Sequence, residues 1–307
     1  MSSVLAMLRF TPPEAFLPFA EAARQEPSLG QQTFRRLREF IYQLSGIYIA
    51  DNRHYFLKAR LLRRLEALGM RSFEEYYDLI TDPGPLAAQE RQELLNSIVV
   101  TETQFFRSPE QFTALAQHVL PELACKQQHL RFWSAGCATG EEAYSLAMVV
   151  VSQRERVLSA HSVEVFATDL SSEAIAKAQA GRYLPVHLRG LPEEYRDFVR
   201  ERYGEYEVVP TVRSLVRFAV LNLLDATSVR SMAPVDVLFC RNVLLYFTPE
   251  VRRQVVATLV EVLRPGGYLF LGVTETLSGL VEGQLQLVHF PRTLAYWKPQ
   301  NDQVPVR

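Results

Sequence analysis

Cysteine and histidine patterns that bind metals are missing from this chain. Its 307 residues include Cys125, Cys137 and Cys240, and no two of them have the short spacing of a zinc or iron–sulfur ligand pair. The six histidines form no His-x-x-x-His cluster, and no Ser/His/Asp or Cys/His set indicates nucleophilic catalysis. We therefore predict no metal site, and we interpret the cysteines as small, buried, reduced residues of a cytosolic protein.

Long apolar runs and a strong charge of either sign are also missing. No apolar run approaches the roughly 18 residues of a membrane span, and residues 1–13 lack the layout of a signal peptide. The formal net charge is -1, so nothing attracts the whole chain to nucleic acid or to an anionic membrane. With 48% hydrophobic residues it can bury a sizeable core. We expect a soluble, cytoplasmic protein with no nucleic-acid partner and no membrane insertion.

Two kinds of pattern divide the chain. Residues 1–30 contain several prolines and predict an irregular lead-in. The apolar spacing is then helical as far as Ser97, which predicts an all-helical domain over 31–98. Beyond Leu130, strands alternate with helices, and this is typical of a doubly wound parallel α/β sheet within a domain over 99–300.

The expected elements can be placed by residue number. Helices are predicted at 33–45, 52–68, 73–80, 86–97, 110–126, 141–153, 172–180 and 249–263, and strands at 130–135, 163–168, 216–221, 235–240 and 267–273. The span 181–215 is too long for a simple connection. It predicts a small inserted β-subdomain, with a helix near 193–202 and a strand at 205–210.

The segment 131–148 is the most informative part of the chain. A short apolar run predicts a buried strand that stops at Gly136 and Gly140, and a helix begins at Glu141. Strand, glycine turn and helix together present backbone N–H groups to a ligand, although a plain structural turn is the alternative. Glu141 and Glu142 at the mouth of the turn disfavour a pyrophosphate. They suit a ligand with a cationic end, such as S-adenosylmethionine (SAM), so the segment favours methyl transfer over hydride transfer.

Polar residues follow three of the predicted strands. Asp169 ends the second strand, where a carboxylate accepts both hydroxyls of a ribose, or else it caps the next helix. Asn222 could read an adenine edge, and Asn242 could hold backbone or the amino-acid part of the ligand; alternatively both shape turns. Tyr246 is either a wall of this pocket or a core aromatic residue.

The segment 101–107 offers a further candidate. Its two adjacent phenylalanines would anchor Thr103 and Arg107. Arg107 is a permanent cation that can hold a carboxylate through two parallel hydrogen bonds, unless it is simply a surface residue.

One face of the helix predicted at 52–68 is basic. Arg53, Arg60 and Arg64 share a stripe beside its leucines. This pattern indicates either a solvated face or a basic patch suited to an acidic partner helix.

Taken together, these segments resemble the CheR-type chemoreceptor methyltransferases, which transfer a methyl group from SAM to receptor glutamates. The resemblance runs from about residue 33 to 298. The matching motifs are Thr-Glu-Thr-Gln-Phe-Phe-Arg (101–107), Trp-Ser-Ala-Gly-Cys-Ala-Thr-Gly-Glu-Glu-Ala-Tyr-Ser (133–145), Ala-Thr-Asp-Leu (167–170), Asn-Leu-Leu (222–224), Phe-Cys-Arg-Asn-Val-Leu-Leu-Tyr-Phe (239–247) and Leu-Arg-Pro-Gly-Gly-Tyr-Leu-Phe-Leu-Gly (263–272).

The resemblance implies a Rossmann-like SAM-methyltransferase sheet and a protein-glutamate O-methyltransferase of chemotaxis, with S-adenosylhomocysteine as product. It implies a SAM pocket lined by Thr103, Arg107, Glu142, Asp169, Asn222, Leu223, Asn242 and Val243, and also by Thr101, where the family usually has asparagine. Arg107 and Tyr246 are the candidate catalytic residues.

The resemblance also implies a partner. Arg53, Arg60 and Arg64 would meet the acidic methylation helices of a chemoreceptor's cytoplasmic part, with the enzyme acting as a monomer. Some members grip a receptor pentapeptide with a glycine-rich loop in the inserted subdomain. Residues 203–209 contain one glycine, so a tethered receptor is not expected.

The reaction needs little acid–base chemistry. A glutamate carboxylate is ionised near pH 7 and the leaving group is a neutral thioether, so the enzyme must mainly supply placement and exclude water. Two other functions stay open: a signalling module that binds SAM without turnover, and a methyltransferase of another protein or of a small molecule.

Overall fold

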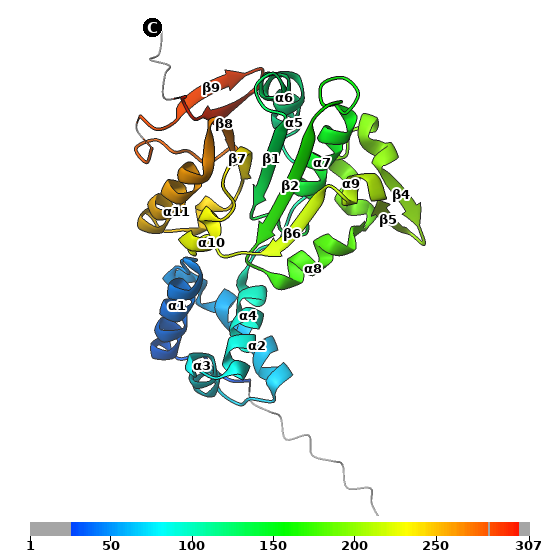
Figure 1. The fold of residues 1–307 in the computed structure, drawn as a ribbon. Coiled ribbons are helices and arrows are strands. Elements are labelled where there is room, and N and C mark those ends of the chain that lie inside the picture. Colours follow the sequence, from blue (N-terminus) through cyan, green and yellow to red (C-terminus); the bar gives the residue numbers. More distant parts are fainter. Residues whose placement is uncertain (1–25, 282, 301–307) are drawn as a thin grey trace, which may run out of the picture.

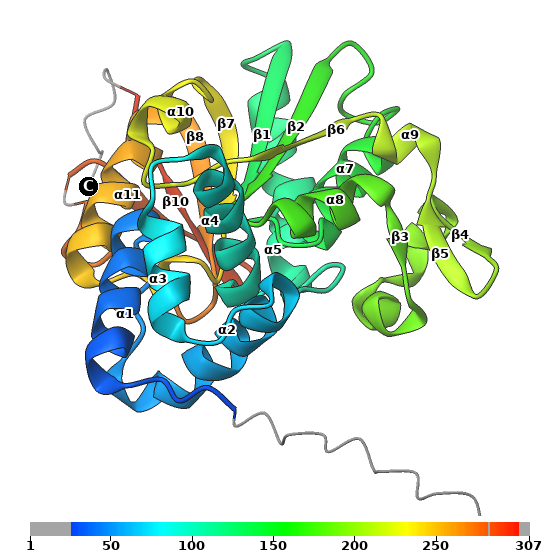
Figure 2. The same cartoon turned by 90° about the horizontal axis from the view of Figure 1, so that it is seen from below.

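The computed structural model describes residues 26–281 and 283–300. Figure 1 shows a helical lobe beneath an α/β lobe, and most of the lead-in predicted over 1–30 lies outside the described residues. Seen from below in Figure 2, the four long helices of the helical lobe lie on one side of the molecule, and strands β3, β4 and β5 lie on the other.

The helical lobe forms where the sequence has helical apolar spacing. Its elements are α1 (Gln31–Ser45), a 3₁₀ turn (Asp51–Arg53), α2 (His54–Leu68), α3 (Phe73–Thr81) and α4 (Pro85–Ile98). Leu57 and Leu61 of α2 are fully buried against α1 and α3 residues such as Phe34 and Tyr76. The four predicted helices are confirmed, and they bury one apolar stripe each.

The α/β lobe is built on a seven-stranded sheet in the order β6-β2-β1-β7-β8-β10-β9. The strands are β1 (His129–Ala135), β2 (Ser162–Asp169), β6 (Val216–Val220), β7 (Val235–Cys240), β8 (Leu263–Leu271), β9 (Gln286–Phe290) and β10 (Thr293–Trp297). The five strands expected from the sequence pair in parallel, as predicted. The hairpin β9–β10 was not predicted, and it adds an antiparallel edge.

Helices cover both faces of this sheet. They are α5 (Pro109–Ala114), a π-helical turn (Leu115–Val119), α6 (Leu120–Ala124), α7 (Glu141–Ser152), α8 (Ser172–Ala180), α10 (Ala226–Arg230) and α11 (Pro249–Val262). Successive residues of a strand point to opposite faces. Phe132 therefore packs in the core under α5 and α7, and Trp133 packs in the core under α11. An apolar layer therefore packs on each face of the sheet, and the carboxyl ends of its parallel strands face the helical lobe.

The insertion between α8 and β6 is a small β-subdomain, as expected. It contains β3 (Arg182–Tyr183), β4 (Val199–Arg202), β5 (Glu205–Val208), 3₁₀ turns at Pro185–Gly190 and Glu193–Phe198, and α9 (Pro210–Arg213). The helix predicted near 193–202 is wrong in its second half. There β4 pairs antiparallel with β5, because a hairpin partner only a few residues away outweighs weak helical spacing.

Two other expectations can be compared with the structure. Cys137 and Cys240 are buried as predicted, but Cys125 is exposed near the end of α6. In the described part of the chain, no helix combines the length and apolar character that crossing a membrane requires.

Candidate functional site

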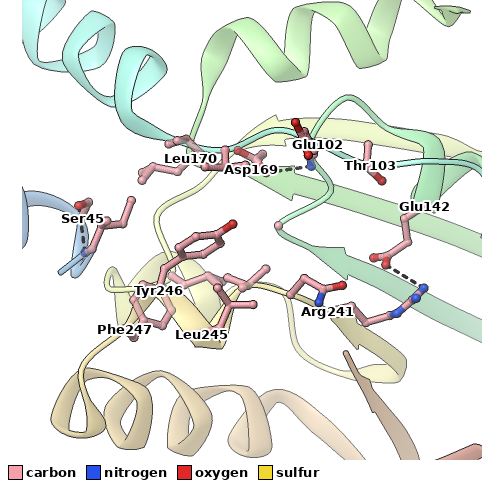
Figure 3. Close-up of a pocket in the computed structure, with 18 of the residues that line it drawn as sticks. Ser45, Glu102, Thr103, Glu142, Asp169, Leu170, Arg241, Leu245, Tyr246 and Phe247 are labelled. Atoms are coloured by element: carbon pink, nitrogen blue, oxygen red, sulfur yellow. Dashed lines mark hydrogen bonds and ion pairs between the residues drawn. The ribbon is translucent and has the colours of Figure 1, made fainter. Parts of the chain in front are cut away.

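A cavity of about 220 Å³ lies at the carboxyl ends of β1, β2 and β7 (Figure 3). This edge, where neighbouring strand connections leave in opposite directions, is the usual ligand site of an open α/β sheet. Nine of the predicted site residues line it: Thr103, Arg107, Glu142, Asp169, Asn222, Leu223, Asn242, Val243 and Tyr246. Segments far apart in the sequence thus meet around one space.

The glycine turn after β1 forms part of the cavity wall. Gly136 has a φ of 79°, and a Cβ there would lie 2.3 Å from Cγ2 of Val243, so only glycine fits. The N–H groups of Gly136 and Cys137 both donate to the Thr168 carbonyl, at 2.8 and 2.9 Å. The turn is therefore fastened to the end of β2 and presses against the loop after β7.

Asp169 connects that turn to the start of α8. Its Oδ2 accepts the N–H of Ala138 and its Oδ1 accepts the N–H of Ser171, both at 2.9 Å. The side chain is buried, which raises the pKa of the carboxyl, and the backbone hydrogen bonds oppose that shift. Ser171, not Asp169, caps α8, because its Oγ accepts the N–H of Ala174. Asp169 itself lines the cavity, where its remaining lone pairs can accept further donors.

A largely buried ion pair lies at one end of the cavity (Figure 3). Glu142 accepts the hydroxyl of Ser134 at 2.6 Å and a guanidinium N–H of Arg241 at 3.3 Å. Burial raises the pKa of the Glu142 carboxyl, and the charges of Arg241 and Arg107 oppose that shift. Figure 3 shows Glu142 and Arg241 side by side at this end. Charges of both signs therefore line one part of the cavity.

Arg241 was not singled out from the sequence, although it directly follows a fully buried strand. It is 5% exposed, donates to the carbonyl of Arg107, and its Nε has no partner among the described residues. Burial lowers the pKa of this guanidinium, and the charge of Glu142 opposes that shift. A buried arginine with an unused donor is a further candidate for ligand contact.

Glu141 was expected to face the ligand from the mouth of the glycine turn, but it is not among the residues that line the cavity. Its carboxylate is fully buried and bonds Thr139 Oγ1 and His187 Nδ1, both at 2.7 Å. Neighbouring helix residues point about 100° apart, so only Glu142 of the two acids faces the cavity. Glu141 instead joins the glycine turn to the inserted subdomain.

Arg107 and Tyr246 both line the cavity, and the charge of Arg107 acts on the Tyr246 phenol. Arg107 is exposed and lies between Phe106 and Ser108, two non-glycine residues with positive φ of 52° and 59°. Such strained backbone persists only where the surroundings hold it, and it often occurs at functional sites. Tyr246 points into the cavity in Figure 3. Burial raises the pKa of its phenol, which the charge of Arg107 opposes, so the hydroxyl is protonated at neutral pH.

The helical lobe closes one side of the cavity. Ser45 and Ile47 line it, and the N–H of Tyr48 donates to the carbonyl of Tyr246 at 3.1 Å. Asn222 donates its amide to the carbonyl of Leu44 at 2.8 Å and accepts the N–H of Leu224 at 3.0 Å. The amide of Asn222 thus joins the two lobes and shapes its own turn.

The basic residues of α2 differ in their environment. Arg64 forms two hydrogen bonds with Glu90, at 2.9 and 2.7 Å, and Glu90 also accepts the hydroxyl of Tyr76 at 2.8 Å. Arg60, Arg63 and Arg64 line a second hollow, of about 340 Å³, together with Thr101 and Lys177 of α8. Thr101 therefore lies beside the cavity rather than among its lining residues, and Arg64 is held within the helical lobe.

Comparisons with known proteins agree over most of the chain. Residues 101–293 match the family described as "CheR methyltransferase, SAM binding domain", and residues 32–99 match "CheR methyltransferase, all-alpha domain". Chemotaxis protein methyltransferase 1 of Pseudomonas aeruginosa is 38% identical over 261 residues, which cover 82% of this chain and 93% of that protein. Chemotaxis protein methyltransferase of Escherichia coli is 34% identical over 258 residues, with 82% and 87% covered.

Proposed function

The chain belongs to the CheR family of chemotaxis protein methyltransferases, and from this premise we propose how its cavity and its basic helix serve that activity. It is a SAM-dependent methyltransferase that modifies glutamates of chemoreceptors. The reaction forms a glutamyl methyl ester and leaves S-adenosylhomocysteine.

The chemistry of the cavity fits SAM. The amino-acid end of SAM carries an ammonium and a carboxylate, and the cavity offers Glu142 paired with Arg241. Asp169 at the strand end has free lone pairs for ribose hydroxyls. Leu170, Leu221 and Leu223 supply apolar surface for a flat base. This combination of paired charges and a separate buried carboxylate in one cavity carries the assignment of the site.

SAM supplies an electrophilic methyl group on a sulfonium when bound. The chain's own residues have the task of placing a carboxylate that is already ionised. Arg107 holds that carboxylate through its guanidinium, and Tyr246, protonated at neutral pH, donates a hydrogen bond from the facing wall. Ile47 and Val100 limit the access of water from the side of the helical lobe. Thr103 and Val243 complete the wall, and Thr101 borders it from outside.

We propose that residues 31–98 recognise the receptor and residues 99–300 carry methyl transfer. The partner surface is the open part of α2, with Arg53 and Arg60 as first contacts for the acidic methylation helix. Arg53, Arg60 and Arg63 form no ion pair within the described part of the chain. Arg64, already paired with Glu90, supports the helix instead of meeting the receptor. On this proposal the enzyme acts in the cytoplasm as a monomer. Light scattering at the protein concentration of the assays tests the monomeric state.

One experiment tests the activity directly. The protein is incubated with methyl-labelled SAM and the cytoplasmic domains of the host's receptors. We expect label on receptor glutamates that mild alkali releases, as an ester requires. Label that resists alkali would point to another acceptor group, and SAM binding without transfer to any receptor fraction would support a sensor that does not turn over.

A further inference from the structure

The segment after β7 is an irregular wall of the cavity. Asn242 has a positive φ of 57°, and a 3₁₀ turn over Leu244–Tyr246 follows. Asn242, Val243, Leu245 and Tyr246 all line the cavity. Neither a sheet ladder nor an α-helix fixes this backbone, so another group must satisfy its N–H donors.

Glu275, in the connection after β8, is that group. Its Oε2 accepts the N–H of Asn242 at 2.7 Å and that of Gly272 at 2.9 Å, and its Oε1 accepts the N–H of Leu245 at 3.2 Å. The N–H of Glu275 donates to the carbonyl of Gly272 at 2.9 Å, which closes the turn that returns the carboxylate. One carboxyl side chain thus accepts hydrogen bonds from three backbone donors, two of them in the cavity wall.

Gly272 is fitted to this arrangement. A Cβ at Gly272 would lie 2.7 Å from Glu275 Oε2 and 2.9 Å from Asn242 Nδ2. Only glycine lets the carboxylate and the Asn242 amide approach this closely. Glu275 itself is not among the residues that line the cavity, so it acts through the backbone of its neighbours.

We propose that Glu275 is a positioning residue for the cofactor: its carboxylate holds the backbone of Asn242 to Leu245 in the conformation that binds SAM. The inference rests on the proposal that this cavity is the SAM site. It assigns a role to the connection after β8, which lies outside the motifs around the cavity. Loss of the carboxylate should weaken cofactor binding and leave receptor binding intact.

The test compares Glu275→Ala and Glu275→Gln with the parent by calorimetric titration with SAM. We expect SAM affinity to fall at least tenfold in Glu275→Ala. A smaller loss is expected in Glu275→Gln, which keeps the shape and one oxygen acceptor. In methylation assays the KM for SAM should rise, and the KM for the receptor at saturating SAM should not change. Gly272→Ala, which pushes the carboxylate away while retaining it, should resemble Glu275→Ala.

Asp225→Ala is the matched control. The Asp225 carboxylate also accepts two backbone N–H groups, at 3.1 and 3.2 Å. These groups belong to the start of α10, which Asp225 caps, and not to the cavity wall. This control should lower the melting temperature with SAM affinity within twofold of the parent. If Glu275→Ala, folded by circular dichroism, binds SAM within twofold of the parent, the positioning role is overturned. If the parent itself binds no SAM, the proposed site fails instead.

Discussion

The two lobes contribute to the cavity by different physical means. The α/β lobe supplies charged and polar side chains at strand ends, among them Asp169 and Glu142. The helical lobe supplies a small hydroxyl and an apolar side chain, Ser45 and Ile47, while Arg60, Arg63 and Arg64 of α2 line a separate hollow. On the function proposed above, chemistry is concentrated in one lobe and partner recognition in the other. Substitutions in the α/β lobe and substitutions in the helical lobe should therefore lower different measured quantities.

The largest effect is expected at Asp169. Asp169→Ala should weaken SAM binding more than 100-fold, about 3 kcal/mol, because it removes two acceptors for ribose hydroxyls and releases the N–H groups of Ala138 and Ser171. Calorimetry measures the loss, and circular dichroism checks the fold. Affinity within tenfold of the parent would remove Asp169 from the site.

Arg107→Ala should separate chemistry from cofactor binding. Its guanidinium is exposed at the cavity, and we expect a roughly 100-fold loss of methyl transfer with SAM affinity changed only a few-fold. Single-turnover methylation at saturating SAM measures the first quantity and calorimetry the second. Turnover close to that of the parent would make Arg107 an ordinary surface residue.

Arg64→Ala and Arg60→Ala form a matched pair from one helix stripe. Arg64 bonds the nearly buried Glu90, so its loss should lower the free energy of unfolding of the helical lobe by about 2 kcal/mol. Among the described residues Arg60 has no such partner, and its loss should cost under about 0.5 kcal/mol. Urea unfolding, followed by circular dichroism, makes the comparison. Equal destabilisation would show that the Glu90 pair is not what distinguishes the two residues.

The smallest effect is expected for charge reversal on the open face of α2. Arg53→Glu with Arg60→Glu should raise the KM for the receptor several-fold and leave SAM affinity unchanged, since exposed charge pairs contribute under about 1 kcal/mol each. Methylation by the parent should fall as salt rises, because such attraction is screened over about 8 Å at physiological ionic strength, and the variant should lose this dependence. The control reverses Arg156 and Arg200, exposed residues on other surfaces. The same salt slope in both variants would locate the receptor contact elsewhere.

Much of this site could be predicted because, in a parallel sheet, the residues that follow successive strands lie along the same edge. Parallel strands bring their carboxyl ends to one edge, so Asp169 and Asn242 reach the same cavity despite their distance in sequence. The side-chain direction of Glu141 was not predictable in this way. A single helical step decides whether an acid faces the ligand space or the inserted subdomain.

Partners from other elements also escaped prediction. Glu90 lies 26 residues from Arg64, and no local pattern in α2 indicates that the two will pair. The hairpin β9–β10 has two short strands in which only Ala295 is buried, so its apolar signal is weak. A role for Arg241 could be predicted only by knowing that Glu142 lies beside it. In each case the deciding contact comes from a segment distant in the chain.

The hydrogen bonds between Asn222 and Leu44 and between Tyr48 and Tyr246 have a thermodynamic consequence. They join the helical lobe to the same loops that bear cavity residues. A change in the position of the lobe would therefore change the free energies of binding of both SAM and the receptor. Linkage is reciprocal: whatever factor SAM imposes on receptor affinity, the receptor must impose on SAM affinity. Each ligand would thereby change the affinity for the other at equilibrium, before any methyl group is transferred.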